Sequence, residues 1–149
     1  MLTVDVVVLT EASVPSLLLV QRAHPPFAGE WALPGGFVEE GERVVDAAPR
    51  ELAEETGLEA GSLQLLGVYD TPGRDPRGWT VSIVYRAGVQ VEEAVSGADD
   101  ARDARWFRTD DLPKLAFDHA AIVDDALERG APGGTSQPAP SSGQGEARG

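Results

Sequence analysis

The sequence contains no cysteine. Disulfide bonds, thiolate catalysis and Cys-based zinc sites are therefore excluded. No stretch approaches the roughly 20 apolar residues that a helix needs to span a bilayer. The first residues, MLTVDVVVLTEA, carry no basic leader, and Asp5 interrupts their apolar run, so they do not resemble a signal peptide. We expect a cytoplasmic, soluble protein with no membrane partner.

Basic residues are also scarce. The 149 residues include 12 Lys and Arg against 25 Asp and Glu, which gives a formal net charge of -13. An acidic surface repels nucleic-acid backbones and anionic membranes, so no nucleic-acid partner is expected. If the substrate is itself a phosphate compound, something must offset the repulsion. A divalent metal held by carboxylates would do this.

The length suits one compact domain, which we place at residues 1–130. The remaining residues, 131–149, contain no large apolar side chain and are dominated by Gly, Pro and Ser. Such a segment buries too little surface to offset the entropy of ordering it. We therefore predict a disordered tail after the domain.

Strands outnumber helices in the pattern of the domain. Apolar and β-branched runs predict strands at 3–10, 16–22, 63–70, 80–89 and 103–108, with two short extended pieces within 31–38. The first two strands are expected to pair. Residues 109–115, TDDLPKL, are typical of a capped helical turn, and 118–130 of a helix that Asp118 caps and Gly130 ends. The order is not a regular βαβα alternation, which favours an α+β fold with a mixed β-sheet flanked by helices.

Three glutamates share one face of a predicted helix in AAPRELAEETG, residues 47–57. Glu51, Glu54 and Glu55 follow the i, i+3, i+4 spacing. Apolar residues on the neighbouring sector would pack on the sheet, and these are Val44, Val45, Ala48 and Leu52. A solvated acidic face is one interpretation. A divalent-metal site is the other, because a hard cation bound by oxygen ligands would reverse the repulsion among the carboxylates.

The segment before this helix, PGGFVEEGE, favours the metal site. Gly35 and Gly36 let the backbone approach a ligand closely and can aim a carbonyl at a metal. Glu42 adds a further carboxylate just ahead of the helix. A loop and a helix that both supply oxygen ligands make the metal interpretation the better one.

The whole stretch resembles the Nudix box. That pattern runs Gly, five residues, Glu, seven residues, Arg-Glu-aliphatic, one residue, Glu-Glu, one residue, Gly-aliphatic. All its fixed positions are met here, by Gly36, Glu42, Arg50, Glu51, Leu52, Glu54, Glu55, Gly57 and Leu58. The strand order and the segments WALPGGFVEEGE and DARWF extend the resemblance across most of residues 1–129.

The resemblance implies a Nudix-type α/β/α sandwich in which the box forms a loop-helix-loop. It also implies hydrolysis, dependent on Mg²⁺ or Mn²⁺, of a nucleoside diphosphate linked to another moiety. The implied metal ligands are Glu51, Glu54, Glu55 and the carbonyl of Gly35. Arg50 would pair with a glutamate, and Glu42 would support the metal-bound water.

The general base stays open at this point. Metal ions lower the pKa of a bound water that attacks phosphorus, and a carboxylate receives its proton. Glu51 is one candidate. Related family members often use a later loop acid, and the candidates of that kind are Glu92, Glu93, Asp99 and Asp100.

The loop YDTPGRDPRGWTVSIVY resembles that of the short prokaryotic ADP-ribose pyrophosphatases. Pro72 stands 15 residues after Gly57, about where that subgroup has a marker proline. RAHPPFAGEWALPGGF and LAFDH resemble it as well. Trp79 departs from the pattern, since another residue, often His, is expected there. The resemblance implies that ADP-ribose and water give AMP and ribose 5-phosphate.

Such a substrate needs cationic partners for its diphosphate and a slot for its adenine. The cationic candidates are Arg22, Arg74 and Arg77, although arginines in such loops are often merely solvated. The candidates for the adenine slot are Phe27, Trp31, Phe117 and Trp79, although aromatics at strand ends are often core residues. Asp118 and His119 are interpreted as a helix-capping pair and not as catalytic groups.

Two alternative functions stay open. The first is a pyrophosphohydrolase for nucleoside triphosphates, including oxidised ones, against which the loop with Pro72 argues. The second is a sensor domain that binds ADP-ribose without hydrolysing it. The acidic charge and the complete glutamate set favour turnover over sensing. Homodimers are common in the family, so a homodimer is expected.

Pro49 lies inside the predicted acidic helix. It lacks the N–H that would bond the carbonyl of Val45, and an interior proline costs about 3 kcal/mol. That cost falls if the proline lies in the first turn. We therefore predict either a helix that begins near Ala47 with Asp46 as its cap, or a kink with the Val45 carbonyl unpaired.

Overall fold

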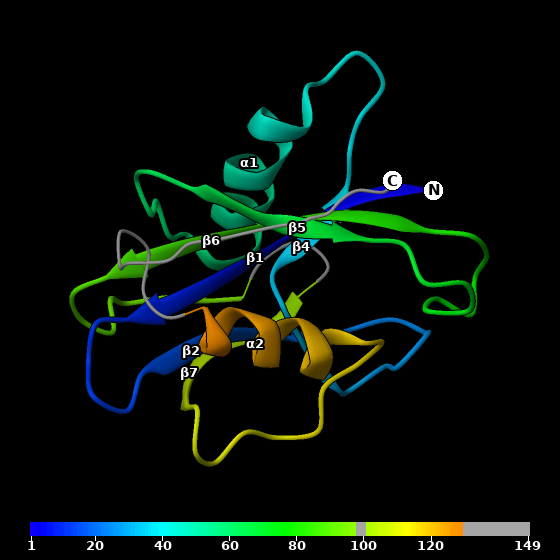
Figure 1. The fold of residues 1–149 in the computed structure, drawn as a ribbon. Helices are drawn as coiled ribbons and strands as arrows, with labels where there is room; N and C mark the ends of the chain where they lie inside the picture. Colours follow the sequence, from blue (N-terminus) through cyan, green and yellow to red (C-terminus); the bar gives the residue numbers. More distant parts are fainter. Residues whose placement is uncertain (98–100, 130–149) are drawn as a thin grey trace.

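A computed structural model describes residues 1–97 and 101–129 of the chain. Within them lie seven strands and two helices (Figure 1). The strands are β1 (Leu2–Thr10), β2 (Ser16–Arg22), β3 (Trp31–Ala32), β4 (Gly35–Phe37), β5 (Gln64–Tyr69), β6 (Val81–Val89) and β7 (Ala101–Arg108). The helices are α1 (Val44–Thr56) and α2 (His119–Glu128). The strands expected from the sequence are thereby confirmed, whereas the expected tail lies outside the described residues.

The strands form one mixed sheet in which β1 and β6 are parallel and every other pair is antiparallel. β1 pairs with β2 at Leu9 and Leu17, near one end of each strand. Toward its other end, β1 pairs with β4 at Thr3, Val4 and Asp5. Toward its own other end, β2 pairs with β3 at Val20 and Gln21. β1 and β2 therefore separate toward Asp5 and Arg22, and the short strands β3 and β4 lie between them.

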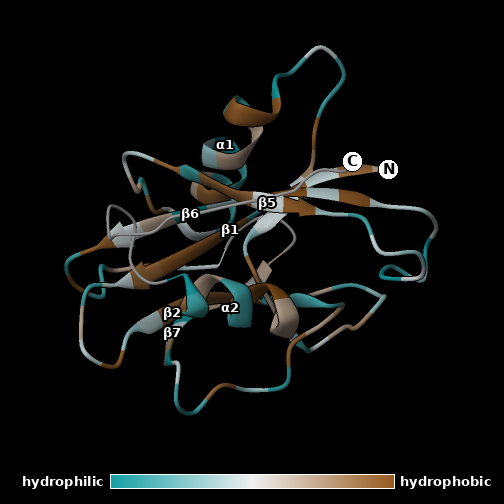
Figure 2. Ribbon diagram, in the orientation of Figure 1, coloured by the Kyte–Doolittle hydropathy of each residue, from teal (hydrophilic) through white to brown (hydrophobic). Residues whose placement is uncertain are grey.

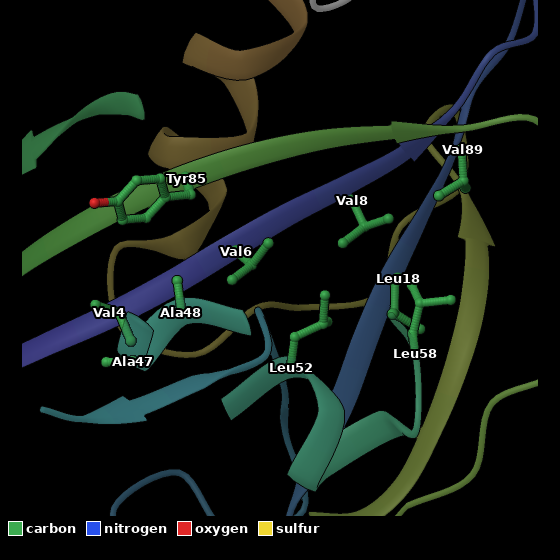
Figure 3. Close-up of a cluster of buried hydrophobic side chains, with 10 residues drawn as sticks. All are labelled: Val4, Val6, Val8, Leu18, Ala47, Ala48, Leu52, Leu58, Tyr85 and Val89. Atoms are coloured by element: carbon green, nitrogen blue, oxygen red, sulfur yellow. The ribbon is translucent and has the colours of Figure 1, made fainter. Parts of the chain in front are cut away.

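The two helices cover opposite faces of the sheet, α1 on one and α2 on the other (Figure 1). Side chains alternate between the faces along β1, as they do on any strand. Val6 and Val8 pack under α1 together with Leu52 (Figure 3). Val7 belongs instead to the core beneath α2, with Ile122. The expected α/β/α sandwich is confirmed.

The hydropathy pattern accounts for this arrangement. β1 is largely hydrophobic along its length, as a strand covered on both faces must be, whereas α2 alternates hydrophilic and hydrophobic surface (Figure 2). Burying a Leu or Val side chain fully contributes about 1.5–3 kcal/mol, so the two cores hold the helices in place. Neither helix in residues 1–97 and 101–129 is long and apolar enough to cross a membrane.

α1 begins before Ala47, where one of the two predictions placed its start. Its first residue is Val44, and its N-cap is Arg43, which makes no side-chain capping bond. The carbonyl of Arg43 accepts the amides of Asp46 and Ala47, both at 3.0 Å. The start near Ala47 and the capping role of Asp46 were therefore wrong, and Pro49 lies inside the helix. The kink at Pro49 stays a prediction.

α1 ends with the residue that the box requires. Gly57 adopts a left-handed conformation with φ of 77°, and its amide bonds the carbonyl of Ala53 at 2.9 Å. Glycine takes this conformation without the steric cost that a Cβ adds, and this is a common way for a helix to stop.

Two local predictions after β7 were wrong. Residues 109–115 form no helical turn: the amide of Asp111 closes a tight turn onto Arg108, and Leu115 then makes a β-bridge with Trp31. Asp118 is the N-cap residue of α2, as predicted, but the expected capping bond from its side chain is absent. Its carboxylate is engaged by an arginine of a distant loop.

Candidate active site

A cavity of about 400 Å³ opens where β1 and β2 separate. Its size is within the range of small-molecule sites. The walls come from both strands, from β4, from one face of α1, from the loop before β6 and from the start of α2. Of the predicted site residues, those that line it are Arg22, Gly35, Arg50, Glu51, Glu54, Glu55, Arg74, Arg77 and Phe117. The separation of two paired strands thus creates the space, and the box supplies one wall.

Arg50 is the centre of the acidic network on α1. It holds Glu42 with two bonds, from Nε at 2.6 Å and from Nη2 at 2.9 Å. Its Nη1 reaches Glu51 at 3.2 Å and Glu54 at 3.0 Å. The bonds between Arg50 and Glu42 raise the pKa of the guanidinium and lower the pKa of the carboxyl. Arg50 therefore ties the loop before α1 to the glutamates of the helix.

Two glycines of β4 lie directly against the α1 glutamates. The amide of Gly35 donates a hydrogen bond to Glu55 Oε1 at 2.9 Å. A Cβ built on Gly36 would lie 2.6 Å from the carboxyl carbon of Glu51, closer than real contacts allow. At Gly36 the backbone of β4 can approach the Glu51 carboxylate only because the residue has no side chain, whereas a Cβ on Gly35 would meet the backbone of β1 instead.

The oxygen-only donor set of these residues suits a hard divalent cation. The three glutamates and the Gly35 carbonyl belong to facing walls of one cavity, which the close approach at Gly36 brings together. Among the described residues, no three Asp, Glu, His or Cys side chains already converge closely enough to hold a metal ion. Arg50 and the Gly35 amide hold the carboxylates instead. The oxygen ligands fit a divalent metal ion. Binding one would require Arg50 to give up hydrogen bonds that it makes to Glu51 and Glu54.

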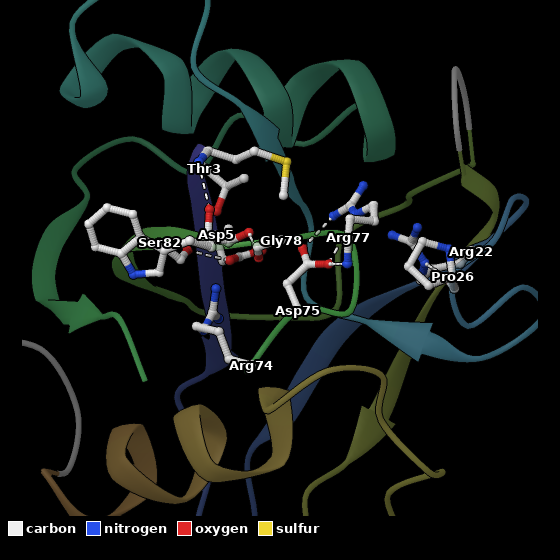
Figure 4. Close-up of polar contacts among 12 residues, drawn as sticks. Thr3, Asp5, Arg22, Pro26, Arg74, Asp75, Arg77, Gly78 and Ser82 are labelled. Atoms are coloured by element: carbon white, nitrogen blue, oxygen red, sulfur yellow. Dashed lines mark hydrogen bonds and ion pairs between the residues drawn. The ribbon is translucent and has the colours of Figure 1, made fainter. Parts of the chain in front are cut away.

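The three candidate arginines differ in how they are engaged, and Figure 4 shows Arg77 against Asp75 and Arg22 beside Pro26. Arg74 forms a bidentate pair with Asp118, at 2.9 and 2.7 Å, and its side chain is only 5% exposed. Arg77 is held by Asp75, at 3.1 and 2.8 Å. Burial would raise the pKa of Asp75, but the hydrogen bonds from Arg77 outweigh it and lower that pKa. Arg22 donates from Nε to the Pro26 carbonyl at 2.6 Å.

Two phenylalanines line the cavity, Phe37 of β4 and Phe117 just before α2, and Phe117 is the one that was predicted. The guanidinium groups of Arg22 and Arg77 lie 4.9 and 5.6 Å from the centre of its ring. Phe27 packs against the same ring edge-on at 4.8 Å without lining the cavity. Phe117 and Phe27 have positive φ, of 54° and 62° respectively, an uncommon backbone conformation for such residues. The wall near α2 therefore offers an aromatic surface flanked by cations.

The remaining candidates lie away from the cavity lining. Trp31 packs edge-on against Phe107, with ring centres 4.8 Å apart, and Trp79 is 74% exposed. Glu92 accepts a hydrogen bond from Ser16, at the end of β2 opposite to Arg22. The carbonyl of Glu93 accepts the indole N–H of Trp106. Asp99 and Asp100 lie outside the described residues.

A polar cluster that was not expected from the sequence includes Asp5 and His119, two nearly buried residues that line the cavity. Ser82 donates to Asp5 at 2.5 Å, and His119 Nε2 lies 3.8 Å from the other oxygen of Asp5. The Nδ1 atom of His119 accepts the amide of Leu33 at 3.0 Å. Burial raises the pKa of Asp5 to about 7 and lowers the pKa of His119 to about 4. The one available signal was the carboxylate of Asp5 in an otherwise apolar strand.

Residues 1–126 match the NUDIX domain family, and the chain belongs to that family. An ADP-ribose pyrophosphatase of Methanocaldococcus jannaschii is 52% identical over 111 residues, which cover 74% of this chain and 65% of that protein. The chain thus spans slightly less than two thirds of this relative.

Two solved structures share the fold. The NUDIX domain of Shewanella oneidensis NrtR, complexed with ADP ribose, is 36% identical with a TM-score of 0.81, and 87% of each chain is covered. A bifunctional NMN adenylyltransferase/ADP ribose pyrophosphatase of Francisella tularensis, complexed with AMP and a Mn ion, is 32% identical with a TM-score of 0.75, covering 85% of this chain and 41% of that one. The Nudix fold expected from the box is confirmed.

Proposed function

We propose that this chain hydrolyses the diphosphate of ADP-ribose and releases AMP and ribose 5-phosphate, with Mg²⁺ as its metal and Mn²⁺ as a substitute. The observation that carries the proposal is a single cavity lined both by the three glutamates of the box and by arginines. The similarity to proteins described as ADP-ribose pyrophosphatases or as complexed with ADP ribose supports this choice of substrate.

Arginines, together with a bound metal, would offset the carboxylates of the cavity lining when an anionic substrate binds. Arg22 and Arg77 face the cavity near Phe117 and are the groups placed to meet the diphosphate. Arg74 has a different role in this proposal: both it and Arg77 are paired with a carboxylate, but the side chain of Arg74 is only 5% exposed, against 36% for Arg77. Arg74 braces the loop before β6 against the start of α2.

Glu51, Glu54, Glu55 and the Gly35 carbonyl would hold the metal. When bound, a divalent metal neutralises charge on the diphosphate and makes a water molecule more acidic. Arg50 keeps Glu51 in place through Nη1, and Glu42 keeps Arg50 in place through its two bonds. Glu51 is the general base we propose, because it lines the cavity whereas Glu92 and Glu93 do not.

Phe117 is the residue we propose for adenine. Its ring is part of the cavity wall, and Phe27 supports it from behind the lining. Stacking on an aromatic face suits a flat heterocycle. The adenine would have to displace the guanidinium of Arg22 or Arg77 from one face of the ring, which couples binding of the base to release of a cation toward the diphosphate.

A substrate panel tests the proposal. ADP-ribose, nucleotide sugars and nucleoside triphosphates, including oxidised ones, are incubated with the protein and Mg²⁺, and the products are separated by chromatography. AMP and ribose 5-phosphate from ADP-ribose are expected as the fastest reaction. Faster turnover of a triphosphate would instead establish the first alternative. Glu51→Gln and Glu55→Gln should each reduce turnover by orders of magnitude while the thermal unfolding midpoint is retained, and near-normal activity in both would remove the glutamate assignment.

The non-hydrolysing sensor is the second candidate. The Shewanella domain is described as complexed with ADP ribose, which is a statement of binding. The complete glutamate set of this chain favours turnover. Catalytic consumption of ADP-ribose would exclude the sensor, whereas tight binding with no product would establish it. A homodimer stays part of our proposal, and light scattering would show it as twice the chain mass of 15.7 kDa.

A further inference from the structure

His119 touches the segment that joins β3 to β4. Its Nδ1 accepts the amide of Leu33 at 3.0 Å, across 86 positions of sequence. Both residues are buried, with exposures of 4% for His119 and 2% for Leu33. A ring nitrogen that accepts a hydrogen bond carries no proton, so the neutral imidazole keeps its proton on Nε2. A side chain of α2 therefore holds the backbone amide of Leu33, just before β4 in the chain.

The next two residues of the segment are held by two other elements. The carbonyl of Pro34 accepts the amide of Val6 in β1 at 2.9 Å. The amide of Gly35 donates to Glu55 of α1, also at 2.9 Å. Three consecutive residues thus connect α2, β1 and α1. The peptide units between them are planar and the proline ring fixes φ, so a displacement of Leu33 is transmitted to Gly35.

We propose that His119 is a positioning residue that, through the amide of Leu33, sets the place of Gly35 and of the Glu55 carboxylate bonded to it. The inference rests on the proposed function, in which Glu55 and the Gly35 carbonyl hold the metal. Without its acceptor, the buried Leu33 amide would lose its hydrogen bond, and the segment would shift to recover one. Burial lowers the pKa of His119 to about 4, which keeps the ring neutral and Nδ1 able to accept near pH 7.

Three substitutions separate the acceptor from the bulk of the side chain. His119→Asn places an amide oxygen, bonded to Cγ as Nδ1 is in histidine, and so keeps an acceptor for the Leu33 amide. His119→Gln is polar but carries its amide one bond further out, and His119→Leu has no acceptor. Val89→Ala is the matched control, because Val89 is a buried core residue at the far end of β6, paired with Thr10, and does not line the cavity.

Two measurements are made on each variant. Amide hydrogen exchange at Leu33 and Gly35 is followed by NMR in the metal-free protein, and the dissociation constant of Mn²⁺ is measured by calorimetry. In the Leu and Gln variants we expect exchange at both amides to accelerate by about tenfold or more. We expect their Mn²⁺ affinity to fall by about 10–100-fold, the usual effect of removing a group that orients a metal ligand. His119→Asn should stay close to wild type, and Val89→Ala should unfold earlier with unchanged Mn²⁺ affinity.

Three results would overturn the inference: wild-type Mn²⁺ affinity and Gly35 protection in the Gln variant, an Asn variant as defective as the Leu variant, or an equal loss of affinity in Val89→Ala. If the Leu variant does not fold, the comparison of Asn with Gln decides alone. A wild-type protein that binds no Mn²⁺ would count against the proposed function. In that case the exchange rate at Gly35 still decides whether His119 positions the segment.

Discussion

Gly36→Ala is the substitution that separates the chemistry of the site most cleanly from the stability of the fold. Gly36 does not have positive φ, so alanine suits its backbone. The conflict is with one side chain, because the new Cβ would lie 2.6 Å from the Glu51 carboxylate. To restore an ordinary contact of 3.4 Å, that carboxylate must retreat by about 0.8 Å. The end of a flexible side chain can do this without moving the sheet.

The expected magnitude follows from that displacement. A misplacement of about 1 Å in a catalytic arrangement can reduce the rate by about 100-fold, which corresponds to about 2.7 kcal/mol of transition-state stabilisation. Stability should change little, because replacing Gly by Ala at a compatible φ changes the free energy of unfolding by about 1 kcal/mol or less. We therefore expect a folded protein with a large loss of turnover.

The assay compares AMP formation from ADP-ribose with thermal unfolding for three alanine variants. Gly67→Ala is the control, because its Cβ would meet Tyr69 at an ordinary 3.6 Å, and both readouts should match wild type. Gly35→Ala should destabilise the protein, because its Cβ would lie 2.1 Å from the backbone carbonyl of Val4. Near wild-type activity in a folded Gly36→Ala protein would refute the role of Glu51, and unfolding of that variant would refute the claim that the conflict is confined to one side chain.

Three further predictions follow from the same contacts. Arg50→Lys keeps the charge but cannot reproduce the paired bonds to Glu42, so kcat should fall by about 10-fold or more with a loss of stability near 1 kcal/mol in urea unfolding. The folded-state pKa of His119, about 4, lies below its ordinary value of 6.5, so its contribution to stability is present above pH 6.5 and is lost as the pH falls through 4. Over that window the free energy of unfolding of the wild type should fall by up to about 3 kcal/mol relative to that of His119→Asn. Unfolding free energies that run parallel for the two proteins across this pH range would contradict the burial of His119. Asp118→Asn should cost about 3 kcal/mol because it leaves the buried Arg74 unpaired, and a loss no larger than that of a surface pair would show that water reaches Arg74.

Local sequence periodicity predicted the part of the site that lies on one helix. The spacing of Glu51, Glu54 and Glu55 placed all three on one face of α1, and all three line the cavity. The glycines before the helix and the left-handed Gly57 that ends it are equally local features. The prediction that the three glutamates share one face succeeded because it depends on residues only a few positions apart, where backbone geometry alone decides which side chains are neighbours.

Predictions that depended on competition with distant residues failed. Asp118 has the residue type of a helix cap, but Arg74, 44 positions away, engages its carboxylate. Residues 109–115 have the composition of a capped helical turn, yet Thr109 bonds the carbonyl of Pro15 and Leu115 pairs with Trp31, which leaves a tight turn followed by an irregular stretch. In both places a tertiary contact outweighed a local preference that is worth only about 1 kcal/mol.

The separation of β1 and β2 is the structural reason that these distant residues form one site. A sheet paired along its whole length would keep α1 and α2 apart on opposite faces. Because β1 and β2 pair only near Leu9 and Leu17, the gap between them admits the segment joining β3 to β4. Through that gap His119 of α2 and Glu55 of α1 each bond the same short segment, one at Leu33 and the other at Gly35. The cavity therefore combines the three glutamates of α1, in one layer of the sandwich, with Phe117 and His119 at the start of the other layer, which neither helix could supply alone.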